Sequence, residues 1–148
     1  YCADFHLNIL KNLEKDLLKN KTLKIEHYAF PLDLAALNAE KIVRCGDSMN
    51  AKFKLLDAIY EKQRQWAVGT DIDKINSSLI AIGKSLNLKE NKLKSCLADE
   101  LLQDEILNER INAQKKYNIE STPTIYINEK KYKGKFDLVS IKKYIEKI

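Results

Sequence analysis

Two short stretches of this sequence carry residues that could do chemistry. Cys2 stands at the start of an amphipathic helical pattern, and Thr122-Pro123 precedes the β-rich run Ile125-Tyr126-Ile127. A helix N-terminus has unpaired N–H groups and a partial positive charge, which stabilise a thiolate. An X-Pro bond adopts the cis form far more readily than other peptide bonds. A lone cysteine is more often a small buried apolar residue, and a lone Thr-Pro is more often trans, so only the combination indicates a reactive site.

Exchange between thiols and disulfides uses two cysteines, and a Cys-x-x-Cys pair would place the first one three positions before Cys2. The sequence starts at Tyr1 and contains three cysteines, an odd number that suggests one thiol with its partner elsewhere. We therefore expect this chain to be the C-terminal part of a longer protein. In that protein Cys2 would be the resolving thiol of the pair.

The composition is that of a soluble globular domain, with 45% apolar and 32% charged residues in 148 residues. The net charge of +5 comes from lysines interleaved with Asp and Glu, which indicates a solvated surface and no nucleic-acid partner. No apolar run is long enough to span a membrane. The three cysteines and two histidines are scattered singly, so no zinc site is predicted, and no other metal or cofactor is expected.

Hydrophobic periodicity predicts a helix, a strand, a block of helices, a hairpin and a final helix. The strand is predicted over Leu23–Phe30, and the hairpin has strands Thr124–Ile127 and Lys131–Lys133 around Asn128-Glu129-Lys130. Helices are predicted over Asp4–Lys19, Leu34–Cys45, Ala51–Ala67, Ile72–Leu86, Lys89–Leu97, Leu101–Lys116 and from Asp137 to Ile148.

This order predicts two domains. Residues 1–31 and 120–148 would form a partial α/β domain, and residues 32–119 an inserted helical domain. By the family resemblance described below, a strand preceding Tyr1 would lie between the two predicted strands of the α/β domain. Without it their facing N–H and C=O groups would be unpaired, at about 1–3 kcal/mol each, so we expect the first strands to be missing from this chain.

The sequence resembles the DsbA-like thiol:disulfide oxidoreductase family, a thioredoxin fold with an inserted α-helical domain. The resemblance rests on four stretches in the family's order, through the whole chain. These are Tyr1-Cys2-Ala3-Asp4-Phe5-His6, the run from Arg44 to Phe53, Lys94-Ser95-Cys96-Leu97, and the run from Ser121 to Asn128. Tyr1 replaces the family's usual His, and Glu129 stands where Gly is common.

The resemblance implies an activity and a set of site residues. Cys2 would be catalytic, together with Thr122 and a cis Pro123. Tyr1 and Ser121 would bind substrate with them. The family donates disulfides to reduced, unfolded proteins in the bacterial periplasm or cell envelope, and a membrane-bound, quinone-linked DsbB-like protein reoxidises it.

Cys45 and Cys96 match positions that form a second, non-catalytic disulfide in some relatives. Such a bridge would close a long loop and stabilise the fold by about 4 kcal/mol in the chain-entropy model. The alternative is a pair of buried free thiols.

Two other functions remain open at this stage. The related glutathione-transferase-kappa and isomerase branch often has Ser in place of the redox pair and binds glutathione; Cys2 argues against it. A DsbA-like adaptor that has lost its first cysteine would bind peptides without redox activity. The residue three positions before Cys2 distinguishes all three functions.

Overall fold

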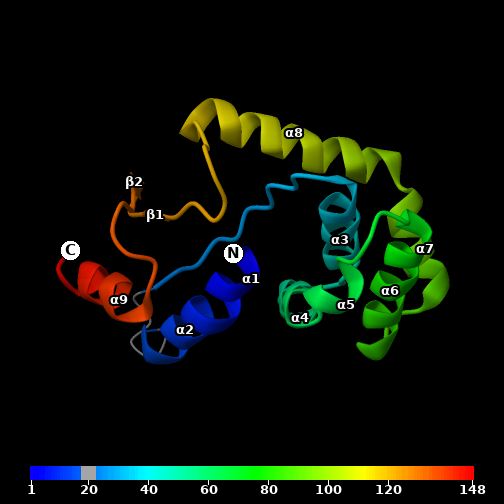
Figure 1. The fold of residues 1–148 in the computed structure, drawn as a ribbon, viewed down its shortest axis with the longest axis horizontal. Helices are drawn as coiled ribbons and strands as arrows, with labels where there is room; N and C mark the ends of the chain where they lie inside the picture. Colours follow the sequence, from blue (N-terminus) through cyan, green and yellow to red (C-terminus); the bar gives the residue numbers. More distant parts are fainter. Residues whose placement is uncertain (18–22) are drawn as a thin grey trace. The chain divides into compact units, whose positions relative to one another are not determined.

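The structure is a computed structural model that describes residues 1–17 and 23–148. The chain divides into two compact units, which Figure 1 shows coloured along the sequence. Unit 1 consists of Tyr1–Tyr28 and Ile119–Ile148, and unit 2 of Ala29–Asn118. Unit 1 is therefore built from both ends of the sequence, and unit 2 from the continuous stretch between them.

Unit 1 starts with an unbroken helix that contains one π-helical turn. Its segments are α1 (Cys2–Asp4), the π turn η1 (Phe5–Leu10) and α2 (Lys11–Leu17). The predicted helix is thus confirmed to Leu17, while Lys19 lies outside the described residues. The N–H of Lys11 donates to the C=O of His6, five residues earlier, which is the wider π spacing.

The π turn fits the spacing of the apolar residues. A repeat of four residues advances about 40° beyond a full turn of an α-helix, so a four-residue stripe drifts around the helix. A wider turn offsets part of this drift and keeps the stripe on one side. All four members of the stripe belong to the core of unit 1: Phe5, Ile9, Leu13 and Leu17.

The strand predicted over Leu23–Phe30 is wrong, because the structure assigns no regular element there. The side chains do alternate as the pattern predicted, with Leu23 and Ile25 half-buried and Lys24 and Glu26 exposed. A strand also needs a neighbouring backbone to bond with. Among the described residues, the ladder that forms is the one between β1 and β2, and this segment takes no part in it.

The hairpin is shorter and tighter than predicted. Strands β1 (Tyr126–Ile127) and β2 (Lys130–Lys131) pair antiparallel around a two-residue turn, with Ile127 opposite Lys130. The turn residues Asn128 and Glu129 have φ of 48° and 67°. Positive φ at both positions defines a type I′ turn, which matches the twist of the strands. The predicted three-residue turn is therefore wrong by one residue.

The last helix, α9 (Leu138–Glu146), begins at the predicted cap, since the Asp137 carboxylate accepts the N–H of Ser140. Ile141 of α9 is 1% exposed and packs with Leu13 and Tyr132 at the centre of the unit 1 core. α9 contacts both the π turn and α2. The long first helix is thus held along most of its length.

Unit 2 is entirely helical among its regular elements, as predicted. Its helices are α3 (Leu34–Arg44), α4 (Met49–Glu61), α5 (Gln63–Trp66), α6 (Ile72–Ser85), α7 (Glu90–Ala98) and α8 (Glu100–Tyr117). The helix predicted over Ala51–Ala67 is split at Lys62, whose ψ of 16° leaves the α-helical range. α3 lies at the centre, where it contacts α4, α6, α7 and α8.

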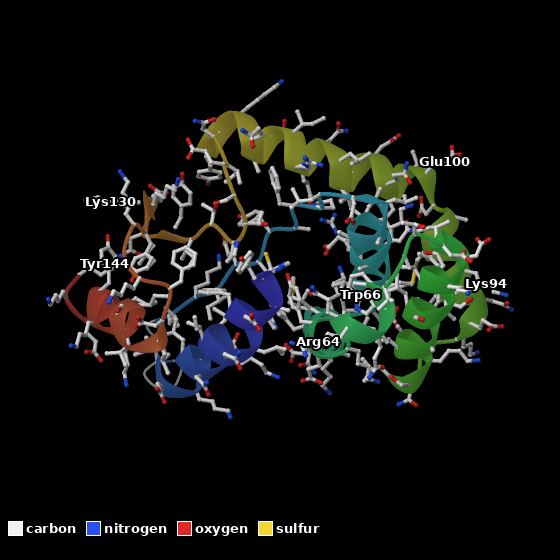
Figure 2. All side chains as sticks on the ribbon, viewed as in Figure 1. Arg64, Trp66, Lys94, Glu100, Lys130 and Tyr144 are labelled. Atoms are coloured by element: carbon white, nitrogen blue, oxygen red, sulfur yellow. A yellow bond between two sulfur atoms is a disulfide. The ribbon has the colours of Figure 1, made fainter. Side chains whose placement is uncertain are left out.

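The core of unit 2 joins these helices through fully buried aliphatic side chains. Ile42, Leu55, Leu79 and Leu93 are each 0–1% exposed, and each contributes about 1.5–3 kcal/mol by burial. Trp66 is also buried, and its indole N–H donates to the C=O of Ile59 at 2.8 Å; Figure 2 shows it among the helices. No helix in the described ranges is both long and apolar enough to cross a bilayer.

A disulfide joins Cys45, just after α3, to Cys96 in α7. Beside it, the buried Lys41 ammonium donates to the C=O of Leu97 at 3.2 Å and to Oε1 of Gln103 at 2.7 Å. Burial lowers the pKa of Lys41. The covalent bond and the Lys41 contacts together hold the end of α7 against α3.

We predict that replacing both Cys45 and Cys96 by Ala lowers the free energy of unfolding of unit 2 by about 2–4 kcal/mol. The bridge spans 51 positions, and its loss restores the entropy of a long loop to the unfolded chain. Guanidinium unfolding followed by Trp66, the only tryptophan in the chain, measures this. Cys2→Ser is the control and leaves the midpoint unchanged; an unchanged midpoint in the double variant would contradict the prediction.

We also predict that Glu129→Gly stabilises the hairpin by about 0.5–1 kcal/mol, because Gly adopts positive φ without a Cβ clash. Hydrogen exchange of the Tyr132 N–H, which bonds to the C=O of Ile125, reports the opening of the hairpin. The matched control is Lys130→Gly in β2, where the same residue weakens a strand. Faster exchange of the Tyr132 N–H in Glu129→Gly than in the wild type would contradict the predicted stabilisation.

Candidate functional site

Cys2 is the first residue of α1, and its thiol is free and half-buried. Tyr1 is the N-cap, and its C=O accepts the N–H of Phe5 at 3.0 Å. The Tyr1 side chain makes no capping bond and is 95% exposed. The Tyr1 side chain therefore leaves the first helical N–H groups uncapped.

The second sequence stretch forms a loop before β1. The Thr122–Pro123 peptide bond is cis. The Thr124 hydroxyl donates to the C=O of Ser121 across the proline, which closes the loop on itself. Thr122 and Pro123 are half-buried and Ser121 is exposed. All three residues of the loop are therefore at least partly accessible to solvent.

One open groove of unit 1 brings the predicted substrate-binding residues together. It has a volume of about 700 Å³. Tyr1, Ser121, Thr122 and Pro123 all line it, although the first two are 120 positions apart in the sequence. Cys2 follows Tyr1 in the sequence and is not itself among the lining residues.

Five further residues line the groove that the sequence did not mark as functional. Four come from the first helix and one from the segment before α9: Asp4, Phe5, Asn8, Ile9 and Phe136. Phe5 and Ile9 also pack against the core of unit 1, so they belong to both surfaces. No sequence signal separates these roles, because the π turn decides which side chains reach the groove. Phe136 could have been noticed as an aromatic residue directly before a helix cap.

Phe136 belongs to a cluster of aromatic rings beside the groove. Its ring lies 6.0 Å from that of Phe5 and 5.9 Å from that of Tyr132. Tyr144 of α9, labelled in Figure 2, meets Tyr132 edge-on at 5.4 Å. These spacings are typical of favourable aromatic pairs. The groove wall is thus continuous with the core of unit 1.

The remaining sequence-predicted residues lie elsewhere. Cys45 and Cys96 form the disulfide of unit 2 and do not line the groove. His6 is buried on the first helix. Within residues 1–17 and 23–148, no three His, Cys, Asp or Glu side chains gather into a group that could hold a metal ion.

Comparison with known proteins places the chain in a family. Residues 1–147 match the model of the family described as Thioredoxin. The chain belongs to the thioredoxin family. Disulfide bond formation protein D of Bacillus subtilis (strain 168) is 28% identical over 155 residues, an alignment that covers 99% of this chain. The chain spans 66% of the length of that relative.

Solved structures share the fold. The crystal structure of Wolbachia pipientis alpha-DsbA1 superposes with a TM-score of 0.85 at 23% identity, covering 99% of this chain and 78% of that one. A variant of the same protein with two cysteines replaced by alanine also gives 0.85, at 22% identity and the same coverage. The predicted thioredoxin-like fold with a helical insertion is confirmed, and so is the resemblance to the DsbA-like family.

The cap next to Phe136 should make unit 1 sensitive to acid. The N–H of Ser140 bonds to the Asp137 carboxylate at 2.7 Å and holds its pKa below the ordinary value. A carboxylate with a lowered folded pKa stabilises the fold above its unfolded pKa, about 3.9, and loses that effect as pH falls through the folded pKa. We predict that α9 loosens below about pH 4.

Hydrogen exchange of the α9 amides between pH 5 and pH 2 measures this, after correction for the intrinsic pH dependence. Asp137→Asn keeps an oxygen acceptor but cannot titrate, so its α9 protection should not change over this range. The control is Asp71→Asn, which alters the cap of α6 in unit 2. It should leave the acid sensitivity of the α9 amides as in the wild type. Equal acid sensitivity in the wild type and in Asp137→Asn would disprove the assignment.

Proposed function

We propose that this protein is a dithiol–disulfide oxidoreductase that donates disulfides to folding secreted proteins through a Cys-x-Tyr-Cys site, with Cys2 as its second cysteine. One observation carries the proposal: Tyr1, the residue before the free, half-buried Cys2, lines one groove with Ser121, Thr122 and Pro123. A lone helix-start cysteine would not support it, but the groove supplies a place for a substrate chain beside the residue that precedes Cys2.

The proposed thiol–disulfide exchange uses Cys2, in the first helical turn, as a leaving group. In the oxidised protein Cys2 is bonded to the first cysteine of the pair. A substrate thiolate attacks the sulfur of that first cysteine, and Cys2 leaves as a thiolate with the bonding electrons. The unpaired N–H groups of the helix start stabilise this charge. A second thiolate of the same substrate then attacks the substrate sulfur of the mixed disulfide, and the first cysteine leaves as a thiolate. The substrate now carries a disulfide, and the protein is a dithiol.

The groove suits an extended peptide. Thr122 stands beside the proline, where its backbone groups would hold the substrate by strand-like hydrogen bonds. Phe5, Ile9 and Phe136 offer an apolar wall, and Asp4 and Asn8 polar groups. Reduced, unfolded proteins expose both the backbone and the apolar side chains that such a groove binds.

The resemblance to the DsbA-like family supports a proposal about partners and location. The Bacillus relative is named a disulfide bond formation protein, and persistent disulfides belong to oxidising compartments. We propose that the protein works in the bacterial periplasm or cell envelope, and that a membrane-bound, quinone-linked DsbB-like protein reoxidises it. The disulfide between Cys45 and Cys96 would be structural.

The central prediction concerns Cys2. In the full-length protein, Cys2→Ser should lower the rate of dithiol peptide oxidation at least a hundredfold, because the variant cannot form the intramolecular disulfide. Once its remaining active-site thiol is activated as a mixed disulfide, the variant should hold a peptide thiol in a trapped adduct visible by mass. The matched control, Cys45→Ser with Cys96→Ser, should keep activity. Unchanged oxidation by Cys2→Ser would refute the proposal.

The residue three positions before Cys2 provides a second test. A cysteine there supports the Cys-x-Tyr-Cys pair, and a serine would favour the glutathione-binding branch. Any other residue would remove dithiol chemistry and leave a peptide-binding protein.

A further inference from the structure

The positive charge of this chain is concentrated in its last stretch. Residues 128–148 contain seven lysines and three acidic residues, and so carry +4 of the total net charge of +5. The stretch has no arginine, since the three arginines of the chain all lie in unit 2. It covers the hairpin turn, β2 and α9, so the charge excess belongs to one part of unit 1. The lysines are Lys130, Lys131, Lys133, Lys135, Lys142, Lys143 and Lys147.

The fold of unit 1 brings β2 and α9 together. The Tyr132 ring, directly after β2, meets the Tyr144 ring of α9 edge-on at 5.4 Å. Lys131 and Lys143 are the chain neighbours of these two tyrosines. Figure 2 labels Lys130 and Tyr144, one from each of the two elements. The aromatic contact therefore places lysines of both elements close to one point of unit 1.

The start of α9 connects two more of the lysines. The pKa of the Asp137 carboxyl is lowered chiefly by the bond from the Ser140 N–H, and the charges of Lys135 and Lys143 add to this effect. Both ammonium groups therefore lie near the same carboxylate, although Lys135 precedes α9 and Lys143 lies within it. The segment after β2 and the outer side of α9 thus belong to one basic surface.

The side chains of this basic surface are exposed and have no close anionic partner. Within residues 1–17 and 23–148, no salt bridge joins any of the exposed lysines of this stretch to a carboxylate. Lys142 is the exception, because it is half-buried and pairs with Asp16 of α2 at 3.6 Å. Like charges that lie together repel one another, and an anionic partner relieves this repulsion. We call the six exposed residues the lysine surface: Lys130, Lys131, Lys133, Lys135, Lys143 and Lys147.

Two aliphatic side chains are exposed on the same part of unit 1. Val139 of α9 is 63% exposed, and Ile148, two residues after α9, is 62% exposed. Positions four apart share one side of a helix, so Val139 and Lys143 lie together on the side of α9 away from the core residue Ile141. This outer side combines apolar and cationic groups, as do helices that lie in the interface of an anionic membrane.

The type of cation indicates which kind of partner fits. The planar guanidinium of Arg binds a single carboxylate or phosphate with two parallel bonds, whereas Lys is a compact point charge on a flexible stem. Protein interfaces are enriched in Arg and depleted in Lys. A surface with Lys alone and exposed aliphatic groups therefore fits the diffuse charge of many lipid headgroups better than it fits an acidic protein.

We propose that the lysine surface, with Val139 and Ile148, binds the surface of a bilayer that contains anionic lipids. The ammonium groups lie among the lipid phosphates, and the two aliphatic side chains enter the boundary between headgroups and acyl chains. None of these residues lines the groove, so the bound protein keeps the groove open. The proposal does not depend on the oxidoreductase function, and it holds the protein at the kind of surface where the proposed reoxidation partner resides.

The test is co-sedimentation of the full-length protein with two kinds of vesicle. One kind is phosphatidylcholine alone, and in the other about 30% of the lipid is phosphatidylglycerol. Partitioning onto the anionic vesicles should be at least about tenfold stronger than onto the neutral ones. It should fall toward the neutral value at about 0.5 M salt, because salt screens the attraction between the lysines and the headgroups.

Two variants with the same change in net charge locate the binding surface. The surface variant should lower partitioning onto the anionic vesicles at least about tenfold. The control variant removes four exposed lysines of unit 2 and should stay within about threefold of the wild type, because the attraction falls off within a Debye length of the membrane. Thermal unfolding checks that both variants keep the fold. The surface variant carries Lys130→Gln, Lys131→Gln, Lys143→Gln and Lys147→Gln, and the control carries Lys54→Gln, Lys74→Gln, Lys89→Gln and Lys115→Gln.

Three results would overturn the proposal. The first is equal partitioning of the wild type onto both kinds of vesicle. The second is unchanged partitioning of the surface variant, or an equal loss in both variants, since binding would then reflect net charge alone. The third uses soluble polyglutamate as a substitute for an acidic protein: if it binds the wild type and the anionic vesicles do not, the partner is a protein.

Oxidation of a dithiol peptide in solution separates this proposal from the proposed function. The wild type and both variants should oxidise the peptide at the same rate, because no groove residue is changed. If the wild type binds anionic vesicles but does not oxidise the peptide, the proposed function fails and the lipid-binding surface stands. If it oxidises the peptide but does not bind the vesicles, the lipid-binding surface is wrong and the function stands.

Discussion

The first helix of unit 1 has to serve two surfaces at once, and the rest of the site depends on how it does so. From Leu13 to Leu17 its apolar side packs into the core with Tyr132 and Ile141. Its first turns contribute to this core and also line the groove that includes Tyr1. An α-helix with an apolar residue every fourth position would rotate these residues progressively away from one another. The π turn over Phe5–Leu10 is the local adjustment that keeps core and groove on the same helix.

The aromatic cluster connects this helix to the other end of the sequence. Phe5 from the first helix meets Phe136, which stacks on Tyr132, which in turn meets Tyr144. The groove wall is therefore backed by a packed core and not by a free loop. Packed interiors resist small displacements, so a substrate would meet a surface of defined shape. This agrees with the proposed thiol–disulfide exchange, which depends on placing one sulfur next to another.

Unit 2 obtains its stability from different sources. Its core of aliphatic side chains surrounds α3, and the disulfide adds a covalent connection between α3 and α7. Ion pairs also connect α3 to α8, because Arg44 of α3 pairs with both Glu40 of α3 and Glu109 of α8. Burial raises the pKa of Glu40, although Arg44 opposes this effect. None of these features uses residues of the groove.

The sequence by itself determined most of the elements and the kind of chemistry. Helices with apolar stripes, such as those predicted over Ile72–Leu86 and from Asp137 to Ile148, were predicted because their determinants are local. The sequence also predicted that Cys2 and Thr122-Pro123 belong to a reactive site, because few residue types can carry out thiol chemistry or form a cis peptide bond. The tertiary structure alone decided that residues 23–30 form no strand, since a strand depends on a partner that no local pattern reports. It also decided that Phe136, Phe5 and Asn8 line the groove, because a groove is made by segments that meet only after folding, and a π turn changes which side chains face it.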